Sequence, residues 1–186
     1  NTFIPSSLAL SLLSNNILLS TTKDIDNDMN TIVFISRHGS KRGGIIGETM
    51  LFQGLIDEFQ DDYSIILFQG HELTLMEQTK IFNSATGIVG VHGGGFSNII
   101  FSKSGTIVIE IPLQPLLEGP YFKEISKLLK LCYVNTRNIF FRYIDNIMIF
   151  NEHKIKQIIT LMKRSLSYKR NGKNIDDAAQ TLCPPL

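Results

Sequence analysis

The chain has 186 residues, of which 43% are hydrophobic, so it can bury one substantial core and we expect one domain. Its formal net charge is +1, and its lysines and arginines are scattered, so it lacks the basic face that general nucleic-acid binding requires. Its 2 cysteines are far apart, without a CxxC motif or a Cys/His cluster, and indicate neither a disulfide framework nor a zinc site.

Residues 1–30 are predicted to form a linking helix followed by a linker. The leucine-rich stretch SSLALSLLSNNILLS has no basic flank and is broken by Ser and Asn, so it is too short and too polar to span a membrane. It is typical of an amphipathic helix that begins near Ser6 or Ser7. The first residue is Asn rather than Met, so we expect a fragment or a processed product with further sequence upstream.

From residue 31 onward, short apolar runs alternate with longer amphipathic segments, which is typical of βαβ units and a parallel sheet. The predicted strands, nearly all apolar as strands covered on both faces should be, span residues 31–36, 63–68, 87–91, 106–111 and 132–135. Apolar spacing predicts helices at residues 48–59, 74–84, 95–101, 121–130 and 152–167. We therefore expect an α/β fold, an open parallel sheet with flanking helices over residues 31–167, and a loosely held polar tail over residues 168–186.

The stretch GVHGGGFSN follows the third predicted strand and opens the next helix. Open α/β sheets bind ligands at the carboxyl ends of their strands. Glycines let a ligand approach the main chain, and the N–H groups that open a helix suit a phosphate. One glycine would satisfy a tight strand-to-helix turn, so Gly93, Gly94 and Gly95 in a row, flanked by His92 and Asn98, favour ligand contact.

This loop matches none of three well-known glycine signatures. A Walker P-loop ends in Gly-Lys-Ser/Thr, but Gly39-Ser-Lys-Arg-Gly-Gly44 is followed by two isoleucines. A dinucleotide-binding fingerprint needs GxGxxG after the first strand, which is absent. His-Gly-Gly-Gly can form the oxyanion hole of an α/β-hydrolase-type esterase, but the required GxSxG nucleophile elbow is missing from the chain. The esterase remains a minor alternative.

Charged residues lie near the ends of two other predicted strands. Arg37, Lys41 and Arg42 follow the first strand, where they can neutralise a phosphate or form a solvated basic turn. Glu110 lies inside the fourth strand, where a carboxylate is costly unless it meets a partner such as ribose hydroxyls or an arginine. His92 either donates to a phosphate or bonds to main chain.

The segment EQTKIFNSATGIVGVHGGGFSNIIFSKSGTIVIEIP resembles the signature segment of glycosyltransferase family 61, in which Glu-Gln opens a helix that leads to Gly-Val-His-Gly-Ala-Gly and then to Asn, Phe and a Val-Ile-Glu strand. The flanking VFISRHGSKR and YFKEISKLLKLCY resemble neighbouring elements of that family, so the likeness covers roughly residues 31–133. Gly94 stands where the family usually has Ala, Phe96 where it has Leu, and Gly47 where it tends to have Asn.

The resemblance implies an inverting transferase that moves a sugar from a nucleotide donor, usually a uridine diphosphate (UDP) sugar, to a hydroxyl of a protein or glycan. It implies a GT-B architecture with two Rossmann-like halves, in which this chain is the C-terminal, donor-binding half beside an upstream N-terminal domain. The nucleotide sugar is a co-substrate, and no metal or other cofactor is indicated. Family members commonly work in the secretory pathway or, in microbes, in the cytoplasm.

The residues assigned to the donor and its diphosphate are Arg37, Arg42, Glu77, Gln78, His92, Gly93, Gly94, Gly95, Asn98 and Glu110. Two of these also have a local explanation. Thr74-Leu-Met-Glu77 predicts a capping box, in which the carboxylate serves the helix end, and Asn98 can cap a turn. The general base is not identified. A nucleotide-binding Rossmann module without a catalytic role remains the main alternative.

Overall fold

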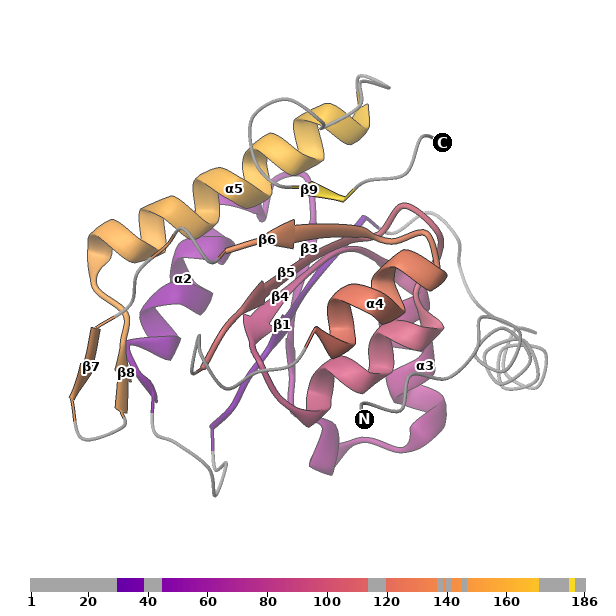
Figure 1. Cartoon of the computed structure of the whole chain (residues 1–186), viewed down its shortest axis with the longest axis horizontal. Helices are drawn as coiled ribbons and strands as arrows, with labels where there is room; N and C mark the ends of the chain where they lie inside the picture. The colour runs from indigo at the N-terminus through magenta and orange to yellow at the C-terminus, as the bar shows by residue number, and fades with distance from the viewer. Residues whose placement is uncertain are drawn as a thin grey trace.

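The computed structural model describes residues 30–38, 45–113, 120–136, 139, 142–144, 147–170 and 181–182. The described residues form an α/β fold around a six-stranded sheet (Figure 1). In sheet order, its strands are β3 (Ser64–Phe68), β1 (Thr31–Ile35), β4 (Ala85–Val91), β5 (Ile107–Ile111), β6 (Cys132–Asn135) and β9 (Thr181–Leu182). The first five run parallel, and β9 pairs antiparallel with β6. The predicted open parallel sheet is confirmed.

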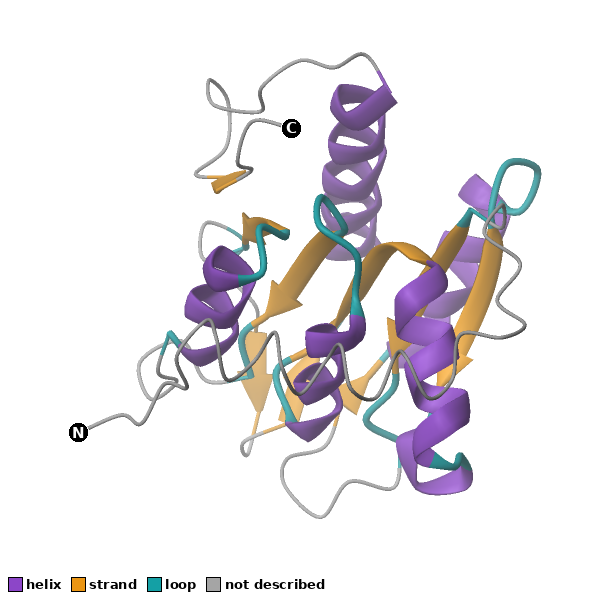
Figure 2. Cartoon of the chain, turned by 90° about the vertical axis from the view of Figure 1, so that its right-hand side faces the viewer, coloured by secondary structure: helices purple, strands orange, loops and turns teal. Residues whose placement is uncertain are grey.

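Helices cover both faces of this sheet (Figures 1 and 2). One face carries α2 (Glu48–Phe59) and α5 (Glu152–Arg170), and the other carries α3 (Leu75–Ser84), the 3₁₀ helix η3 (Gly94–Phe101) and α4 (Tyr121–Leu128). A short 3₁₀ turn, η2 (Gly70–Glu72), lies between β3 and α3. The helix after the glycines was predicted without its type, and its i→i+3 bonds, such as Phe96 N–H to the Gly93 carbonyl at 3.0 Å, make it 3₁₀.

Alternation of side chains along the strands builds two separate cores. Ile32 and Phe34 of β1 pack with α2 and α5, whereas Val33 and Ile35 of the same strand pack with α3 and η3. Successive side chains of a strand point to opposite faces, so a strand covered on both sides must be apolar throughout. This is the reason that the apolar runs predicted the strands closely.

A second sheet of three short strands was not predicted. It consists of β2 (Ile45–Ile46), β8 (Ile147–Ile149) and β7 (Arg142–Ile144), in that order. The Tyr143 hydroxyl donates to the Pro112 carbonyl at 3.1 Å, which ties this sheet to the segment after β5. Strands of two or three residues are too short to show a period, so their pairing is set by tertiary contacts.

Cys132 in β6 is disulfide-bonded, a bond that the cysteine pattern did not indicate. Cysteine spacing gave no sign of this bond because the pairing of β6 with β9 joins segments far apart in the chain. That pairing also holds Thr181 and Leu182 within a tail predicted to be loose, and α5 continues past its predicted end as far as Arg170.

Some predictions concern parts of the chain that are not described. The N-terminal helix, most of the linker after it, and Lys41 and Arg42 lie outside the described residues. Within the described ranges, every helix is too short or too polar to cross a membrane.

Candidate functional site

The sheet order identifies one place where a ligand is expected to bind. β1 and β4 are neighbours, with β3 beyond β1 and β5 beyond β4. The chain therefore leaves β1 and β4 toward opposite edges of the sheet, which makes the gap between their carboxyl ends the topological switch point. Arg37 follows β1 and His92 follows β4. Two of the predicted site residues thus flank the switch point.

Arg37 joins the ends of both strands. Its Nη1 donates to the backbone carbonyl oxygen of His92, and its backbone N–H donates to Oε1 of Glu48 at 2.6 Å. The Ser36 hydroxyl donates to the other oxygen of Glu48 at 3.2 Å. Glu48 is the first residue of α2, so the first turn of that helix anchors the loop that carries Arg37. The guanidinium is half-buried and held in place before any ligand arrives.

Gly47, directly before Glu48, has a φ of 86°, in the left-handed region that glycine and asparagine tolerate best. This conformation is one that both Gly and the Asn usual at this position in the resembled family can adopt. A Cβ at residue 47 would also lie 2.6 Å from the Phe150 carbonyl oxygen, so glycine fits best here.

The three consecutive glycines have different roles. A Cβ at Gly93 would clash with Nη1 of Arg37, and a Cβ at Gly95 would lie 2.6 Å from Cγ2 of Ile35. Both glycines are therefore explained by close packing inside the chain. A Cβ at Gly94, in contrast, would meet nothing within 4 Å. Gly94 is the glycine whose exposed side is open to an approaching ligand.

His92 is held by a carboxylate on the neighbouring strand. Its Nδ1 is hydrogen-bonded to Oε1 of Glu110, and the Tyr133 hydroxyl donates to Oε2 of the same carboxylate at 2.7 Å. An ionised carboxylate only accepts hydrogen bonds, so Nδ1 carries the proton. The exposed fractions of the two side chains are 23% for His92 and 9% for Glu110. The costly carboxylate predicted for Glu110 thus has partners, which are a histidine and a tyrosine.

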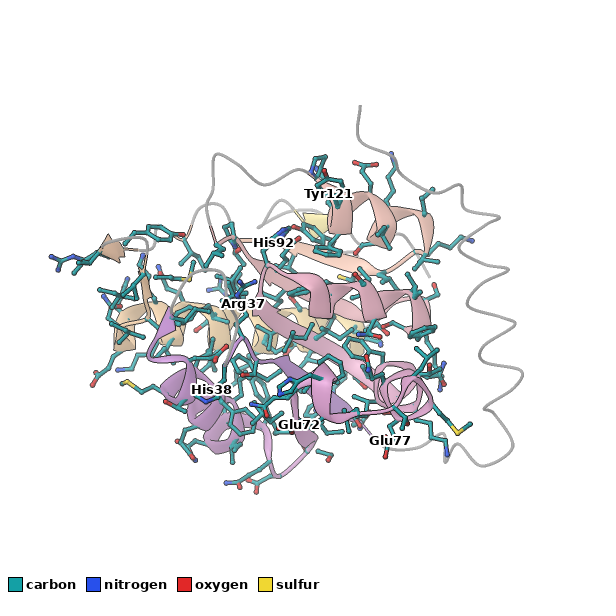
Figure 3. The ribbon with its side chains drawn as sticks, turned by 90° about the horizontal axis from the view of Figure 1, so that it is seen from below. Arg37, His38, Glu72, Glu77, His92 and Tyr121 are labelled. Atoms are coloured by element: carbon teal, nitrogen blue, oxygen red, sulfur yellow. The ribbon has the colours of Figure 1, made fainter. Side chains whose placement is uncertain are left out.

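An aromatic ring covers this cluster from α4. The centroid of the Phe122 ring lies 5.3 Å from that of His92 and 5.4 Å from that of Phe96 in η3. In Figure 3, Arg37 and His92 lie close together on the ribbon, with Tyr121, an exposed residue beside Phe122, beyond His92. The site is therefore built from β1, β4, β5, β6 and the first turn of α4.

Three other assigned residues serve local structure. Glu77 accepts from the backbone N–H and the hydroxyl of Thr74, both at 2.7 Å, and completes the predicted capping box. The bonds from the hydroxyl and then the N–H of Thr74 lower the pKa of Glu77 below its ordinary value of 4.5. Gln78 donates to the carbonyls of Gly70 and Leu73 at 2.9 and 3.0 Å, and Asn98 donates to that of Gly95 at 3.2 Å.

Figure 3 shows Glu77 well away from Arg37 and His92. The structure therefore brings Arg37, His92, Gly93, Gly94 and Glu110 together, and Asn98 supports their loop. It does not bring Glu77 to them. Sequence analysis missed Glu48 and Tyr133. The only sign of Glu48 in the sequence is its place as an acidic residue in the first turn of a helix. The contact of Tyr133 with Glu110 spans 23 residues, so no local sequence pattern reveals it.

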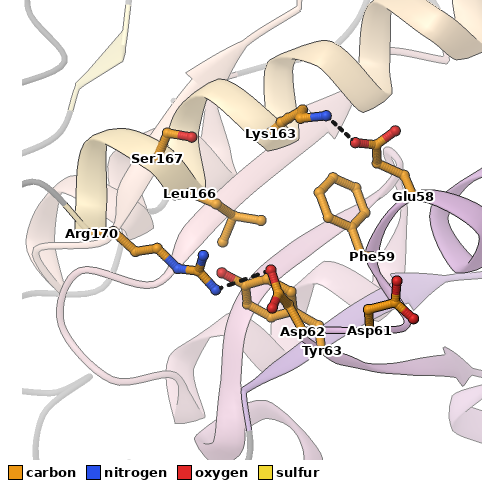
Figure 4. Close-up of a pocket in the computed structure, with 9 residues that line it drawn as sticks. All are labelled: Glu58, Phe59, Asp61, Asp62, Tyr63, Lys163, Leu166, Ser167 and Arg170. Carbon is orange, nitrogen blue, oxygen red and sulfur yellow. Dashed lines mark hydrogen bonds and ion pairs between the residues drawn. The ribbon is translucent and has the colours of Figure 1, made fainter.

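A cavity of about 430 Å³ lies elsewhere, between α2 and α5 (Figure 4). Asp61 lines it, and four further charged side chains form two ion pairs: Lys163 with Glu58, and Arg170 with Asp62 at 3.3 Å. None of the assigned site residues lines it. We therefore assign these ion pairs to holding α5 against α2 and the turn that follows it.

Comparison with known proteins supports the resemblance drawn from the residues. The family model described as Glycosyltransferase 61 matches residues 6–109, more than half of the chain, including Arg37 and the whole His92 loop. No curated protein matches the chain. The matched segment contains β1, β4 and the residues that follow each strand, which form the switch point. The chain belongs to glycosyltransferase family 61.

Proposed function

We propose that this chain binds the donor in an inverting glycosyltransferase that moves a sugar from a nucleotide sugar, a UDP sugar, to a hydroxyl of a protein or glycan. Family membership supports sugar transfer in general. The observation that carries the finer proposal is the placement of the Arg37 guanidinium. It donates to the His92 carbonyl at the switch point and lies against Gly93, the residue before the open Gly94.

The chemistry of transfer explains why a cation belongs there. The acceptor oxygen forms a bond to the anomeric carbon while the bond from that carbon to the diphosphate oxygen breaks. The nucleoside diphosphate leaves with the electron pair, and the acceptor proton passes to a general base. Negative charge therefore grows on the leaving diphosphate, where a fixed guanidinium and main-chain N–H groups stabilise it. The proposal needs no metal cofactor.

The acceptor surface and the general base are assigned to an upstream domain, which would complete a two-domain GT-B cleft. The chemistry of the cluster supports this division. Its cation, open glycine and half-buried histidine suit an anionic leaving group, and Glu110, the carboxylate within it, is engaged by His92 and Tyr133. The esterase is not proposed, since the sequence has no nucleophile elbow.

Saturation-transfer NMR with UDP tests the proposal. We expect wild-type chain to bind UDP and Arg37→Ala to bind it more weakly by about 1.5–3 kcal/mol, the worth of a hydrogen bond to a charged group. Arg142→Ala, which removes an exposed arginine on β7, is the matched control and should bind as wild type does. Thermal unfolding of each variant confirms that it is folded. Equal UDP binding by wild type and Arg37→Ala would remove Arg37 from the donor site.

A further inference from the structure

Glu110 is fixed at both its backbone and its side chain. The Thr136 hydroxyl donates to the backbone carbonyl of Glu110 at 2.6 Å, and the Tyr133 hydroxyl donates to its side-chain Oε2 at 2.7 Å. The remaining oxygen, Oε1, meets Nδ1 of His92. The backbone of His92 is fixed as well, because its N–H donates to the Ile111 carbonyl at 2.8 Å.

The last torsion of a glutamate side chain is the one that packing controls least. Its energy varies little with rotation, so the plane of a carboxylate is set by its hydrogen-bond partners. Tyr133 is half-buried in the core formed with α3, η3 and α4, so its hydroxyl comes from a ring that packing holds in place. The fixed Tyr133 hydroxyl therefore favours one orientation of the Glu110 carboxylate plane.

We infer that Tyr133 is a positioning residue for the donor site, which acts through Glu110 to hold the His92 ring with its proton on Nδ1. The hydrogen bond at one nitrogen of a histidine determines which nitrogen carries the proton and how the ring is turned. Tyr133 therefore determines, through the intervening carboxylate, what His92 presents at the switch point. Its effect on UDP rests on the proposed function, whereas its effect on the ring does not.

The ring is tested without any ligand. We would label the histidine ring nitrogens with ¹⁵N, record long-range ¹H–¹⁵N correlations at alkaline pH, where the ring is neutral, and identify the His92 signals by their loss in His92→Asn. Wild type should show the proton on Nδ1. Tyr133→Phe, which removes only the hydroxyl, should give a mixture of both tautomers. Glu110→Gln, whose amide can donate to Nδ1, should move the proton toward Nε2.

Tyr143→Phe is the matched control, because it removes a tyrosine hydroxyl that donates nearby to the Pro112 carbonyl and not to Glu110. It should leave the His92 ring signals as in wild type. Titration with UDP then measures the consequence. We expect Tyr133→Phe to weaken UDP binding on the order of 3- to 10-fold, and Tyr143→Phe to leave it unchanged.

Unaltered His92 ring signals in Tyr133→Phe would overturn the inference. So would altered ring signals combined with wild-type affinity for UDP, because Tyr133 would then have no influence on the donor. If wild-type chain does not bind UDP at all, the proposed function fails instead, and the ring measurement still decides whether Tyr133 positions His92.

Discussion

Gly94→Val separates the two explanations of the glycine loop, a turn or a ligand contact. A Cβ at this position meets nothing within 4 Å, and its φ lies outside the left-handed region, so the fold should accept a branched side chain. We expect the free energy of unfolding to change by no more than about 0.5 kcal/mol, as at an unconstrained surface position. The valine branches would fill the space through which a phosphate reaches the main chain.

Loss of a main-chain hydrogen bond to a charged phosphate costs about 1.5–3 kcal/mol, which corresponds to roughly 10- to 150-fold in affinity. We expect the wild-type chain to bind UDP with a dissociation constant on the order of 0.1–1 mM, so Gly94→Val should show almost no saturation transfer to UDP. Gly94→Ala, the residue usual in the family, is the control and should fold and bind. A Gly94→Val chain that is folded and binds UDP like wild type would refute the reasoning and reduce the loop to a turn.

Three further predictions concern the charged groups and the isolated chain. Arg42→Ala should weaken UDP binding by about 1.5–3 kcal/mol if it bonds a phosphate, and Lys41→Ser should matter less, as calorimetry would show. The pKa of Glu77 is lowered in the folded state, so the stabilising contribution of its carboxylate is complete above pH 4.5 and is lost as the pH falls through the folded pKa. The difference in free energy of unfolding between wild type and Glu77→Gln, measured in urea, should therefore vanish in acid. A difference that persists in acid would contradict this. The chain alone should bind UDP but transfer no sugar. Positioning two substrates lowers the activation barrier by roughly 7–11 kcal/mol, and one wall of a cleft cannot position both. Turnover by the isolated chain would show that the general base lies within it.

The central sheet could be predicted because its signal is local. The parallel strands β1, β4 and β5 are buried on both faces, so the sequence shows a continuous apolar run at each of them. The capping box at Thr74 marks where α3 begins. The small sheet of β2, β8 and β7 carries no such signal. Its strands are too short to show a period, and Ile45 lies opposite Met148 only because the chain folds back over about a hundred residues.

The candidate site was predictable in position but not in its internal contacts. Arg37 and His92 follow apolar strands, and the rule for open sheets places such residues at one edge. The reason for each glycine depends on its neighbours in space, which the sequence does not show. A Cβ would meet Arg37 at Gly93 and Ile35 at Gly95, and would meet no atom within 4 Å at Gly94. The partners of Glu110 likewise come from two other strands, so the sequence could predict that it needs a partner but not which one.

The contact between Gly93 and Arg37 restricts the order in which this site can change. A methyl group at position 93 would occupy the space of Arg37 Nη1, so Gly93→Ala must displace the end of that side chain from the His92 carbonyl while Arg37 is present. Once Arg37 is replaced by alanine, that space is empty and the second substitution should cost little, so the two effects should not add. A lineage that loses Arg37 first can then lose Gly93 at little cost, whereas the reverse order passes through a chain in which Arg37 is displaced from the His92 carbonyl. Positions 37 and 93 should therefore vary together among related sequences.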